Sequence, residues 1–244
     1  MQIITIGLVK MFRQLLKDRL GKRLGVPTIP FALERVKHAG FSPQHVFDVG
    51  AYKGEFATLC LDLWPDTSVT CFEVLPKPSG EIRQLVGRHR NLRLISCLLG
   101  ARCQDKVEFH LEETASSVLV ENAVPQKHKA SFPMRTVDDV VSRELGRQPP
   151  DFLKMDVQGY ELEVLKGAVN SLKNMSLVLA EVNLLDLHKN VPLLADLVGW
   201  MSERGWVAYD ICGLTRRPLD HALWQADMIF VPSDSPLRAD KHWK

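Results

Sequence analysis

The sequence predicts one α/β domain in which helices cover both faces of a mostly parallel sheet. Its 244 residues suit a single large domain better than two small ones. Short apolar runs alternate along the chain with segments of helical period, which is typical of parallel strands joined by right-handed crossovers. The last two apolar runs are separated only by a polar loop, which indicates a closing hairpin. We therefore expect a Rossmann-like, doubly wound sheet of seven strands whose last strand is antiparallel.

The individual elements follow from this alternation. Apolar runs predict strands at residues 45–49, 68–73, 92–97, 151–156, 177–181, 206–211 and 227–231. Apolar residues at helical spacing predict helices at residues 31–39, 56–63, 81–88, 160–166 and 192–203. Residues 106–111 alternate apolar and polar side chains, which predicts one further, exposed strand. No stretch reaches the ~18 consecutive apolar residues that a membrane-spanning helix needs.

Charge and cysteine content narrow the class of protein. The formal net charge is +2, so no strong global field indicates a nucleic-acid partner. The five cysteines are scattered and never spaced as Cys-x-x-Cys, which argues against a disulfide framework and against a zinc site. Such cysteine usage fits a reducing compartment, and we expect a cytoplasmic protein.

Residues 1–40 are expected to form an N-terminal helical extension ahead of a catalytic domain over residues 41–244. Cations interleave with apolar residues at helical spacing near the start of the chain, at Lys10, Arg13, Lys17, Arg19, Lys22 and Arg23. The interpretation we favour is a helix that packs its apolar stripe on the domain and leaves its cations in water. Weak contact with an anionic membrane surface is the alternative.

A glycine turn follows the first predicted strand and opens a helix, with the sequence Asp48-Val-Gly-Ala-Tyr-Lys-Gly54. Glycine lets the backbone approach a ligand closely, and a helix N-terminus offers unpaired N–H groups. Glu73 ends the second strand, where nucleotide-binding folds place an acid against ribose hydroxyls. The three-glycine spacing of a dinucleotide site is absent, and Asp48 would meet an amino group better than a pyrophosphate. The two strand-end carboxylates therefore suit S-adenosylmethionine, and a plain structural turn is the alternative.

The most specific motif is Phe152-Leu-Lys-Met-Asp-Val-Gln-Gly-Tyr-Glu-Leu-Glu-Val-Leu-Lys-Gly167. Shorter motifs accompany it at Phe47-Asp-Val-Gly-Ala51, Cys71-Phe-Glu-Val74, Ser116-Ser117 and Met134-Arg-Thr-Val-Asp-Asp139. Taken together, they resemble the FkbM family of methyltransferases. The resemblance implies a class I methyltransferase fold, S-adenosylmethionine as the cofactor, and O-methylation of a sugar, glycan or natural product.

The resemblance also implies roles for individual residues. Asp48, Gly50 and Gly54 would line the S-adenosylmethionine pocket. Glu73 would bind the ribose, and Asp156 would end the fourth strand beside the transferred methyl group. Their neighbours are expected to complete the cofactor pocket, namely Ala51, Tyr52, Val74, Cys97 and Leu98.

Transfer of a methyl group to a hydroxyl requires alignment of the acceptor oxygen and removal of its proton. The candidates for the catalytic base at the open end of the sheet are Asp156, Glu181 and His188. Lys154 lies two residues before Asp156 and should point to the same side of the strand. Gln158 stands where the family usually has glutamate, so no acid–base role is expected there.

Three alternatives remain open beside this interpretation. Asp156, Glu181 and Asn183 offer oxygen ligands for a magnesium ion, although we expect catalysis without a metal. An NAD(P)-dependent Rossmann oxidoreductase is a second alternative, disfavoured by the broken glycine spacing. A non-catalytic Rossmann-type binding domain is the third, disfavoured by the intact acids at the strand ends.

Residues 112–134 show no sustained period, and a segment of this length without regular structure is usually functional. Its polar side chains suit a small-molecule or carbohydrate acceptor, and they are Ser116, Ser117, Lys127, His128 and Lys129. We expect this segment to form an acceptor-site loop, the alternative being a solvated surface loop.

Overall fold

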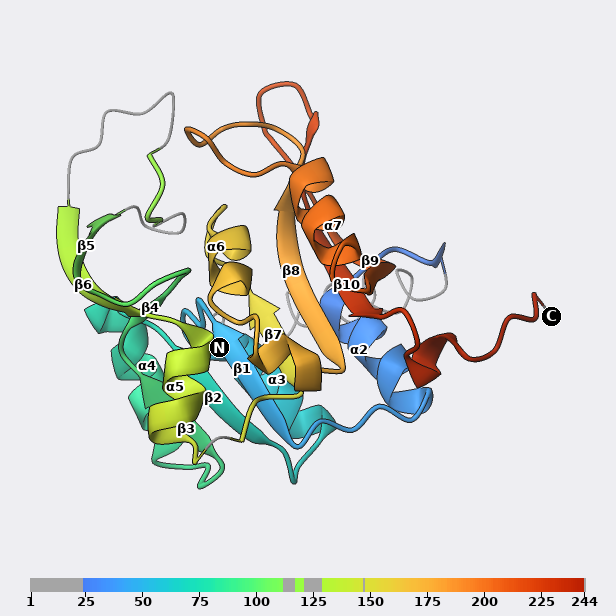
Figure 1. The fold of residues 1–244 in the computed structure, drawn as a ribbon, viewed down its shortest axis with the longest axis horizontal. Coiled ribbons are helices and arrows are strands. Elements are labelled where there is room, and N and C mark those ends of the chain that lie inside the picture. Colours follow the sequence, from blue (N-terminus) through green and yellow to red (C-terminus); the bar gives the residue numbers. More distant parts are fainter. Residues whose placement is uncertain (1–23, 112–116, 121–128, 147, 244) are drawn as a thin grey trace, which may run out of the picture.

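The computed structural model describes residues 24–111, 117–120, 129–146 and 148–243, and its centre is a seven-stranded sheet (Figure 1). The strand order is β3-β2-β1-β7-β8-β10-β9. The strands are β1 His45–Val49, β2 Ser68–Phe72, β3 Leu92–Ile95, β7 Phe152–Met155, β8 Leu177–Asn183, β9 Trp206–Arg216 and β10 Leu223–Pro232. The first five run parallel, whereas β10 is antiparallel to both β8 and β9. The predicted doubly wound sheet with an antiparallel last strand is confirmed.

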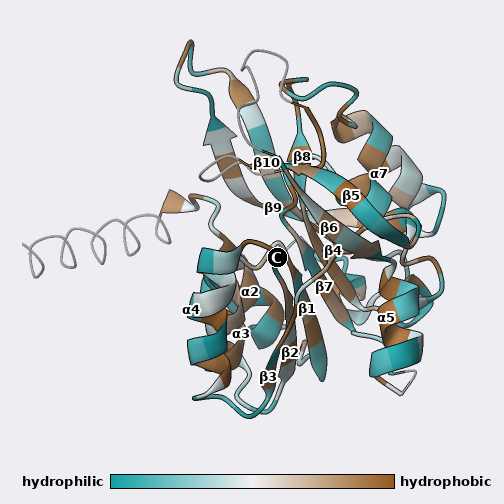
Figure 2. Cartoon of the chain, turned by 90° about the vertical axis from the view of Figure 1, so that its left-hand side faces the viewer, coloured by the Kyte–Doolittle hydropathy of each residue, from teal (hydrophilic) through white to brown (hydrophobic). Residues whose placement is uncertain are grey.

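Helices cover both faces of this sheet, and each layer packs its own apolar cluster against the strands. The helices of one face are α2 Ile29–His38, α3 Glu55–Leu63 and α4 Pro76–Val86. Those of the other face are α5 Val137–Glu144, α6 Glu161–Lys166 and α7 Leu194–Ser202. Figure 2 shows hydrophobic strands in the middle, with α2, α3 and α4 to one side and α5 to the other. Neighbouring strand residues alternate between the two clusters, as the two-residue period of a strand requires.

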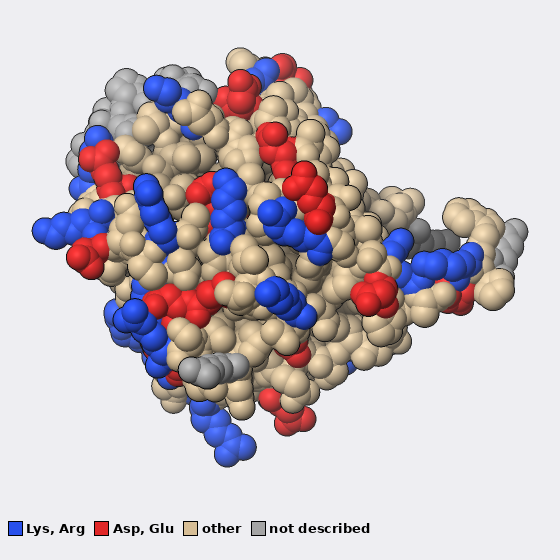
Figure 3. All heavy atoms as spheres, in the orientation of Figure 1, with Lys and Arg blue, Asp and Glu red and all other residues tan. Residues whose placement is uncertain are grey.

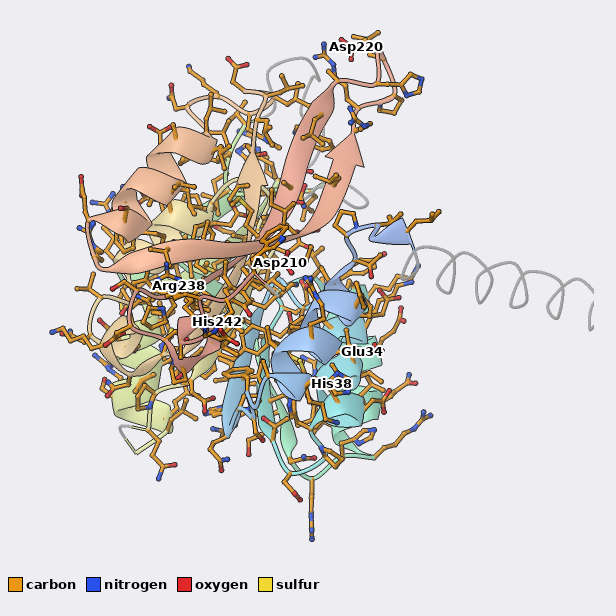
Figure 4. All side chains as sticks on the ribbon, turned by 90° about the vertical axis from the view of Figure 1, so that its right-hand side faces the viewer. Glu34, His38, Asp210, Asp220, Arg238 and His242 are labelled. Carbon is orange, nitrogen blue, oxygen red and sulfur yellow. The ribbon has the colours of Figure 1, made fainter. Side chains whose placement is uncertain are left out.

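The first described helix joins the chain's beginning to its last strands. Thr28 caps α2 by accepting a hydrogen bond from the backbone N–H of Phe31, 3.4 Å away. Leu33 and Val36 are buried, and Arg35 forms an ion pair with Asp210 of β9. Figure 4 shows Asp210 on β9 close beside α2. Part of the predicted N-terminal extension therefore packs on the sheet.

A second, smaller sheet lies beside the first and has the order β4-β6-β5. Its strands are β4 Leu98–Leu99, β5 Gln104–His110 and β6 Lys129–Arg135. The sequence predicted no regular structure over residues 129–134, and the structure differs there. Residues 130, 132 and 134 are less exposed than their neighbours, and Pro133 has no ladder partner at a register shift, where a strand tolerates proline.

Other boundaries differ by a few residues, each for a local reason. α4 begins at Pro76 rather than near residue 81, because proline in the first helical turn sacrifices no hydrogen bond. β3 ends at Ile95, since the chain then turns to the small sheet. The unpredicted helix α5 is capped by Thr136, whose Oγ1 accepts from the backbone N–H of Asp139 at 2.9 Å.

The charged side chains are mixed on the face drawn in Figure 3, where lysines and arginines are interspersed with aspartates and glutamates. None of the described helices is long and apolar enough to cross a bilayer. The predicted basic helix falls within residues 1–23, which lie outside the described residues.

Phe152 is the centre of an aromatic cluster between β7 and the α2–α3 layer. Its ring is fully buried and lies 5.9 Å from Phe41, 5.8 Å from Phe56 and 6.5 Å from Trp64, measured between centroids. All three pairs are edge-to-face, the arrangement that the aromatic quadrupole favours. This cluster anchors the central strand beneath the ends that carry the site.

We predict that Phe152→Ala lowers the free energy of unfolding by about 3–5 kcal/mol, because it leaves a cavity that its rigid neighbours fill only in part. Leu219→Ala is the matched control, since Leu219 is 83% exposed and its loss should change stability by less than about 0.5 kcal/mol. Urea denaturation followed by circular dichroism measures both. Equal urea midpoints for the two variants would contradict the conclusion that the Phe152 cluster anchors β7.

Candidate active site

A cavity of about 320 Å³ opens at the carboxyl ends of β1, β2 and β7. In the sheet, β1 lies between β2 and β7. The chain continues from β1 to β2 and β3 on one side, and the strands from β7 onward lie on the other side. Such a topological switch point is where open α/β sheets bind ligands. Apolar side chains form one wall, from Phe72, Cys97, Leu98, Leu99 and Phe109.

The turn between β1 and α3 depends on two glycines. Gly50 has φ +72°, and an added Cβ would collide with the backbone carbonyl of Asp156. Gly54 has φ +81° and precedes the first residue of α3. The N–H groups of Gly50 and Ala51 both donate to the carbonyl of Phe72 at 3.1 Å, which ties the turn to the end of β2. The turn therefore brings the backbone of Gly50 close to the end of β7 at the cavity.

Glu73 is held in one orientation by backbone donors. Its Oε2 accepts from the N–H of Tyr52 at 2.9 Å, and its Oε1 accepts from the N–H groups of Val74 and Leu75, each at 2.8 Å. Burial raises the pKa of Glu73, and these three donors oppose that rise. The result is a nearly buried carboxylate fixed at the rim of β2 and facing the cavity that it lines.

Lys154 forms a buried ion pair that connects β1 to β7. Its Nζ lies 3.1 Å from Oδ1 of Asp48, donates to the carbonyl of Gly50 at 3.2 Å, and lies 3.9 Å from Oδ2 of Asp156. Burial alone would lower the pKa of Lys154, but the carboxylates of Asp48 and Asp156 outweigh it and raise that pKa. Lys154 is therefore charged, and it reaches the cavity as one of its lining residues.

The loop between β7 and α6 is shaped by a buried acid that sequence reasoning missed. Glu161 accepts from the N–H of Val157 at 2.9 Å and from that of Gly159 at 3.3 Å. Gln158 and Gly159 both have positive φ, at 53° and 95°. Burial, with the charge of Asp156 adding to it, raises the pKa of Glu161 to about 7. The sequence carries a signal for this role, because an acid in the first turn of a helix commonly accepts hydrogen bonds from backbone N–H groups of the preceding loop.

This loop places the amide of Gln158 between two acids. Its Nε2 donates to Oδ1 of Asp156 at 2.9 Å and, more loosely, to Oε1 of Glu181 at 3.5 Å. The Asp156 side chain is 44% exposed and lines the cavity, as does Gln158. Glu181 adjoins the cavity through Gln158 rather than lining it. The strand-end acids of β7 and β8 are thus connected by an amide.

Polar residues continue from β8 to β10 along the same face of the sheet. Glu181 pairs in register with Asp227, and Asn183 pairs with Gln225. The Nε2 of Gln225 donates to Oε1 of Glu181 at 2.5 Å and to Oδ1 of Asn183 at 3.3 Å. Burial raises the pKa of Glu181 to about 10 and that of Asp227 to about 6, and in both cases the charge of Asp156 adds to the rise.

The structure brings most of the predicted site residues together. Eight of the ten residues predicted for the cofactor pocket line the cavity, namely Gly50, Ala51, Tyr52, Glu73, Val74, Cys97, Leu98 and Asp156. Asp48 is instead fully buried against Lys154, and Gly54 lies at the start of α3. Of the three predicted catalytic residues, Asp156 lines the cavity and Glu181 adjoins it. His188 is buried in the loop after β8.

Residues 117–120 cross the tips of the main sheet beside the cavity. The hydroxyl of Ser117 donates to the carbonyl of Gln158 at 2.9 Å and accepts from the N–H of Leu119 at 3.0 Å. The carbonyl of Val120 accepts from the N–H of Lys189 at 2.8 Å, and Val118 lines the cavity. We call residues 117–120 the strap.

The other polar residues predicted for the acceptor-site loop do not lie in the strap. Lys129 lies on β6, and its ammonium group is 2.7 Å from Oε1 of Glu108 in an exposed ion pair. Ser116, Lys127 and His128 lie outside the described residues. Within the described part of the chain, no three histidines, cysteines, aspartates or glutamates are grouped so that they could hold a metal ion.

Comparison with known proteins agrees with this geometry. The chain is 25% identical to the 2-O-methyltransferase NoeI of Sinorhizobium fredii, over 62% of this chain and 69% of NoeI. It is 26% identical to the hexuronic acid methyltransferase AglP of Haloferax volcanii, over 57% of this chain and 55% of AglP. The crystal structure of an FkbM methyltransferase from Methylobacillus flagellatus shares the fold, with a TM-score of 0.53 and 19% identity over 78% of this chain and 43% of that chain.

A match to a family profile shows the family itself. The sequence profile of the methyltransferase FkbM domain matches residues 48–207, which is more than half of the chain. That range begins at the acid of the β1 turn and includes the strap, the β7 motif and β8. The resemblance seen in the sequence is confirmed, and the chain belongs to the FkbM family of methyltransferases.

Proposed function

We propose that this chain transfers a methyl group from S-adenosylmethionine to a hydroxyl oxygen of a carbohydrate. One observation carries the proposal, namely that the fixed carboxylate of Glu73 and the exposed carboxylate of Asp156 flank the same cavity. The first suits a ribose diol, and the second suits the reacting end of the cofactor and the acceptor hydroxyl.

The donor groups of the cavity fit S-adenosylmethionine. Oε1 of Glu73 takes two backbone donors, whereas Oε2 takes one and retains a lone pair for a ribose hydroxyl. The apolar wall around Cys97 and Leu98 suits an adenine ring. Lys154 neutralises Asp48, so Asp156 is the carboxylate left in contact with the cavity near β7, where it would face a cationic sulfonium or ammonium.

The protein needs to align the acceptor hydroxyl and to accept its proton. When bound, the cofactor supplies an electrophilic methyl group on its sulfonium. Asp156 lies at the end of β7 and is the group we assign to accept the acceptor's hydroxyl proton. Lys154 and Gln158 hold Asp156 from two sides, at 3.9 Å and 2.9 Å, so that its carboxylate is oriented before the acceptor arrives.

A carbohydrate acceptor is supported by the relatives and by the polar surroundings of Asp156. NoeI is named as a 2-O-methyltransferase and AglP as a methyltransferase of a hexuronic acid. In this chain, amides and carboxyls gather beside Asp156, at Gln158 and Glu181, and such groups suit a hydroxyl-rich ligand.

The proposal also includes the organisation of the chain into an extension and a catalytic domain. Residues 41–244 would form the catalytic domain, and residues 1–40 a helical extension whose α2 segment packs on it. Contact of the first residues with an anionic membrane surface would be weak. Four of the five cysteines are free and buried, which supports a cytoplasmic location.

The first prediction from this proposal concerns the cofactor. Glu73→Ala should weaken S-adenosylmethionine binding by about 1–3 kcal/mol, because a charged hydrogen-bond partner of the ribose is removed. NAD should not bind to either form. Titration calorimetry measures both affinities, and Glu203→Ala on the exposed end of α7 serves as the control. Tight NAD binding without any S-adenosylmethionine signal would overturn the proposal.

A second prediction concerns metal dependence. We expect initial rates to be the same with EDTA and with added magnesium. The amide N–H groups of Gln158 and Gln225 already occupy oxygens of Asp156 and Glu181 that a metal would need. Activity that disappears in EDTA and returns with magnesium would make Asp156, Glu181 and Asn183 metal ligands instead.

A third prediction concerns the strap, which we propose is one described part of the acceptor-site segment over residues 112–134, whose last residues lie in β6. Ser117→Ala removes its hydrogen bond to the loop after β7, and a lost hydrogen bond of about 0.5–1.5 kcal/mol should raise the acceptor KM several-fold. The affinity for S-adenosylmethionine should stay unchanged. Ser202→Ala, at an exposed position of α7 outside this segment, is the control. Wild-type kinetics in both variants would show that the strap does not shape the acceptor site.

A further inference from the structure

Glu181 is distinguished from the other acids of the site by how its two oxygens are used. Oε1 accepts from Nε2 of Gln225 at 2.5 Å and from Nε2 of Gln158 at 3.5 Å. Among the described residues, no hydrogen bond uses Oε2, and Oε2 is not among the buried polar atoms that lack a partner. The residue is 9% exposed, and Gln158 connects its carboxyl group to that of Asp156.

The orientation of the two amides follows from their partners. Nε2 of Gln158 faces Oδ1 of Asp156, a carboxylate oxygen that accepts hydrogen bonds when ionised. Nε2 of Gln225 faces both Glu181 and the side-chain oxygen of Asn183. Two donors therefore converge on Oε1, which gives this oxygen the role of a carbonyl. A proton on the carboxyl group is consequently placed on Oε2.

The surroundings favour the protonated form. Glu181 lies on β8 among three other acids, with Asp227 opposite it on β10 and Asp156 and Glu161 following β7. Lys154 is the cation that faces it, and this ammonium group is already paired with Asp48. Burial and the neighbouring carboxylates together hold the pKa of Glu181 far above neutrality, and Lys154 only partly offsets them.

We propose that Glu181 is a neutral hydrogen-bond donor that recognises a second oxygen of the acceptor, next to the hydroxyl that Asp156 deprotonates. Gln225 is the positioning residue that keeps Oε1 in the accepting role and so presents the proton of Oε2 to the ligand. This assignment rests on the proposed function, and it makes the acceptor class a vicinal diol. Asp156 and Glu181, held together by Gln158, would offer one acceptor and one donor to two adjacent sugar oxygens.

A matched pair of variants separates this role from that of a base. Glu181→Gln keeps both features, because the new amide oxygen can accept from Gln225 and the new NH₂ group can donate to the ligand. We expect it to retain kcat/KM within about threefold, whereas Glu181→Leu should lose at least about tenfold, mainly through KM. A general base replaced by glutamine would instead lose about 10²–10⁴-fold in kcat.

The substrate side of the test uses methyl glycosides of glucose, galactose, mannose and glucuronic acid, together with analogues that lack one hydroxyl next to the methylated position. In the wild type, removing that neighbouring hydroxyl should cost about tenfold in kcat/KM. In Glu181→Leu the same removal should cost little, because the two changes delete the same interaction. Gln225→Met should act in the same direction, and the variant that combines it with Glu181→Leu should be no worse than Glu181→Leu alone.

The outcomes distinguish this inference from the proposed function. If the wild type binds S-adenosylmethionine but methylates none of these probes, the proposed carbohydrate function fails. In that case, infrared difference spectra between wild type and Glu181→Gln at neutral pH still test the state of Glu181. A lost protonated carboxyl band supports the inference, and a lost carboxylate band overturns it. Where the wild type is active, a Glu181→Gln variant as impaired as Glu181→Leu also overturns it.

Discussion

The ion pair between Lys154 and Asp48 is the interaction on which the site depends. It joins β1 to β7, the two neighbouring strands from which the strand order runs outward in opposite directions. The same ammonium group holds the carbonyl of Gly50 and lies close to Asp156, so one cation fixes both sides of the cavity floor. Removing one member of such a buried pair generally costs about 3–5 kcal/mol, because the other charge is left uncompensated. The position of the turn and the orientation of the β7 acid are therefore fixed together.

Four carboxyl groups near this pair have different roles because their partners differ. Glu73 is bound by backbone N–H groups and stays at the rim, while Glu161 turns inward and shapes a loop. Asp156 remains open to the cavity, and Oε1 of Glu181 accepts hydrogen bonds from two amides. In our proposal, these carboxyl groups divide into a ligand for ribose, a structural acceptor, a proton acceptor and a proton donor. Environment, rather than residue type, makes these assignments.

The sequence predicted the sheet and most of the cavity because those features depend on local patterns. Strand-end acids, glycine turns and the alternation of strand and helix are all legible within a few residues. The role of Asp48 was less accessible, since its carboxylate meets Lys154 only when β1 pairs with β7 in one particular register. Gln225 was missed for the same reason, because its contact with Glu181 spans 44 residues and depends on the pairing of β8 with β10.

In the small sheet, β5 was predicted as an exposed strand at residues 106–111, whereas its partners β4 and β6 were not. β6 contains a proline, so its period is weak, and its partner β5 precedes it by a long segment of irregular sequence. Its inward side chains are recognisable only when the strand is seen against β5 and β4. The helix α5 was also missed, although the Thr136 cap and the helical spacing of the buried residues Val137, Val140 and Val141 both indicate a helix. Boundaries set by tertiary pairing are the ones that single-sequence reasoning placed least well.

The position of α2 has a thermodynamic consequence. Ile29, in the first turn of this helix, lines the cavity, and the same helix is paired with β9 near the other end of the chain. A ligand that contacts Ile29 would therefore contact a helix that is docked on β9. By mass action, a cofactor that binds only when α2 is docked would add its own binding free energy to the cost of detaching α2. Occupancy of the cavity and docking of α2 on β9 would then be linked equilibria, each strengthening the other.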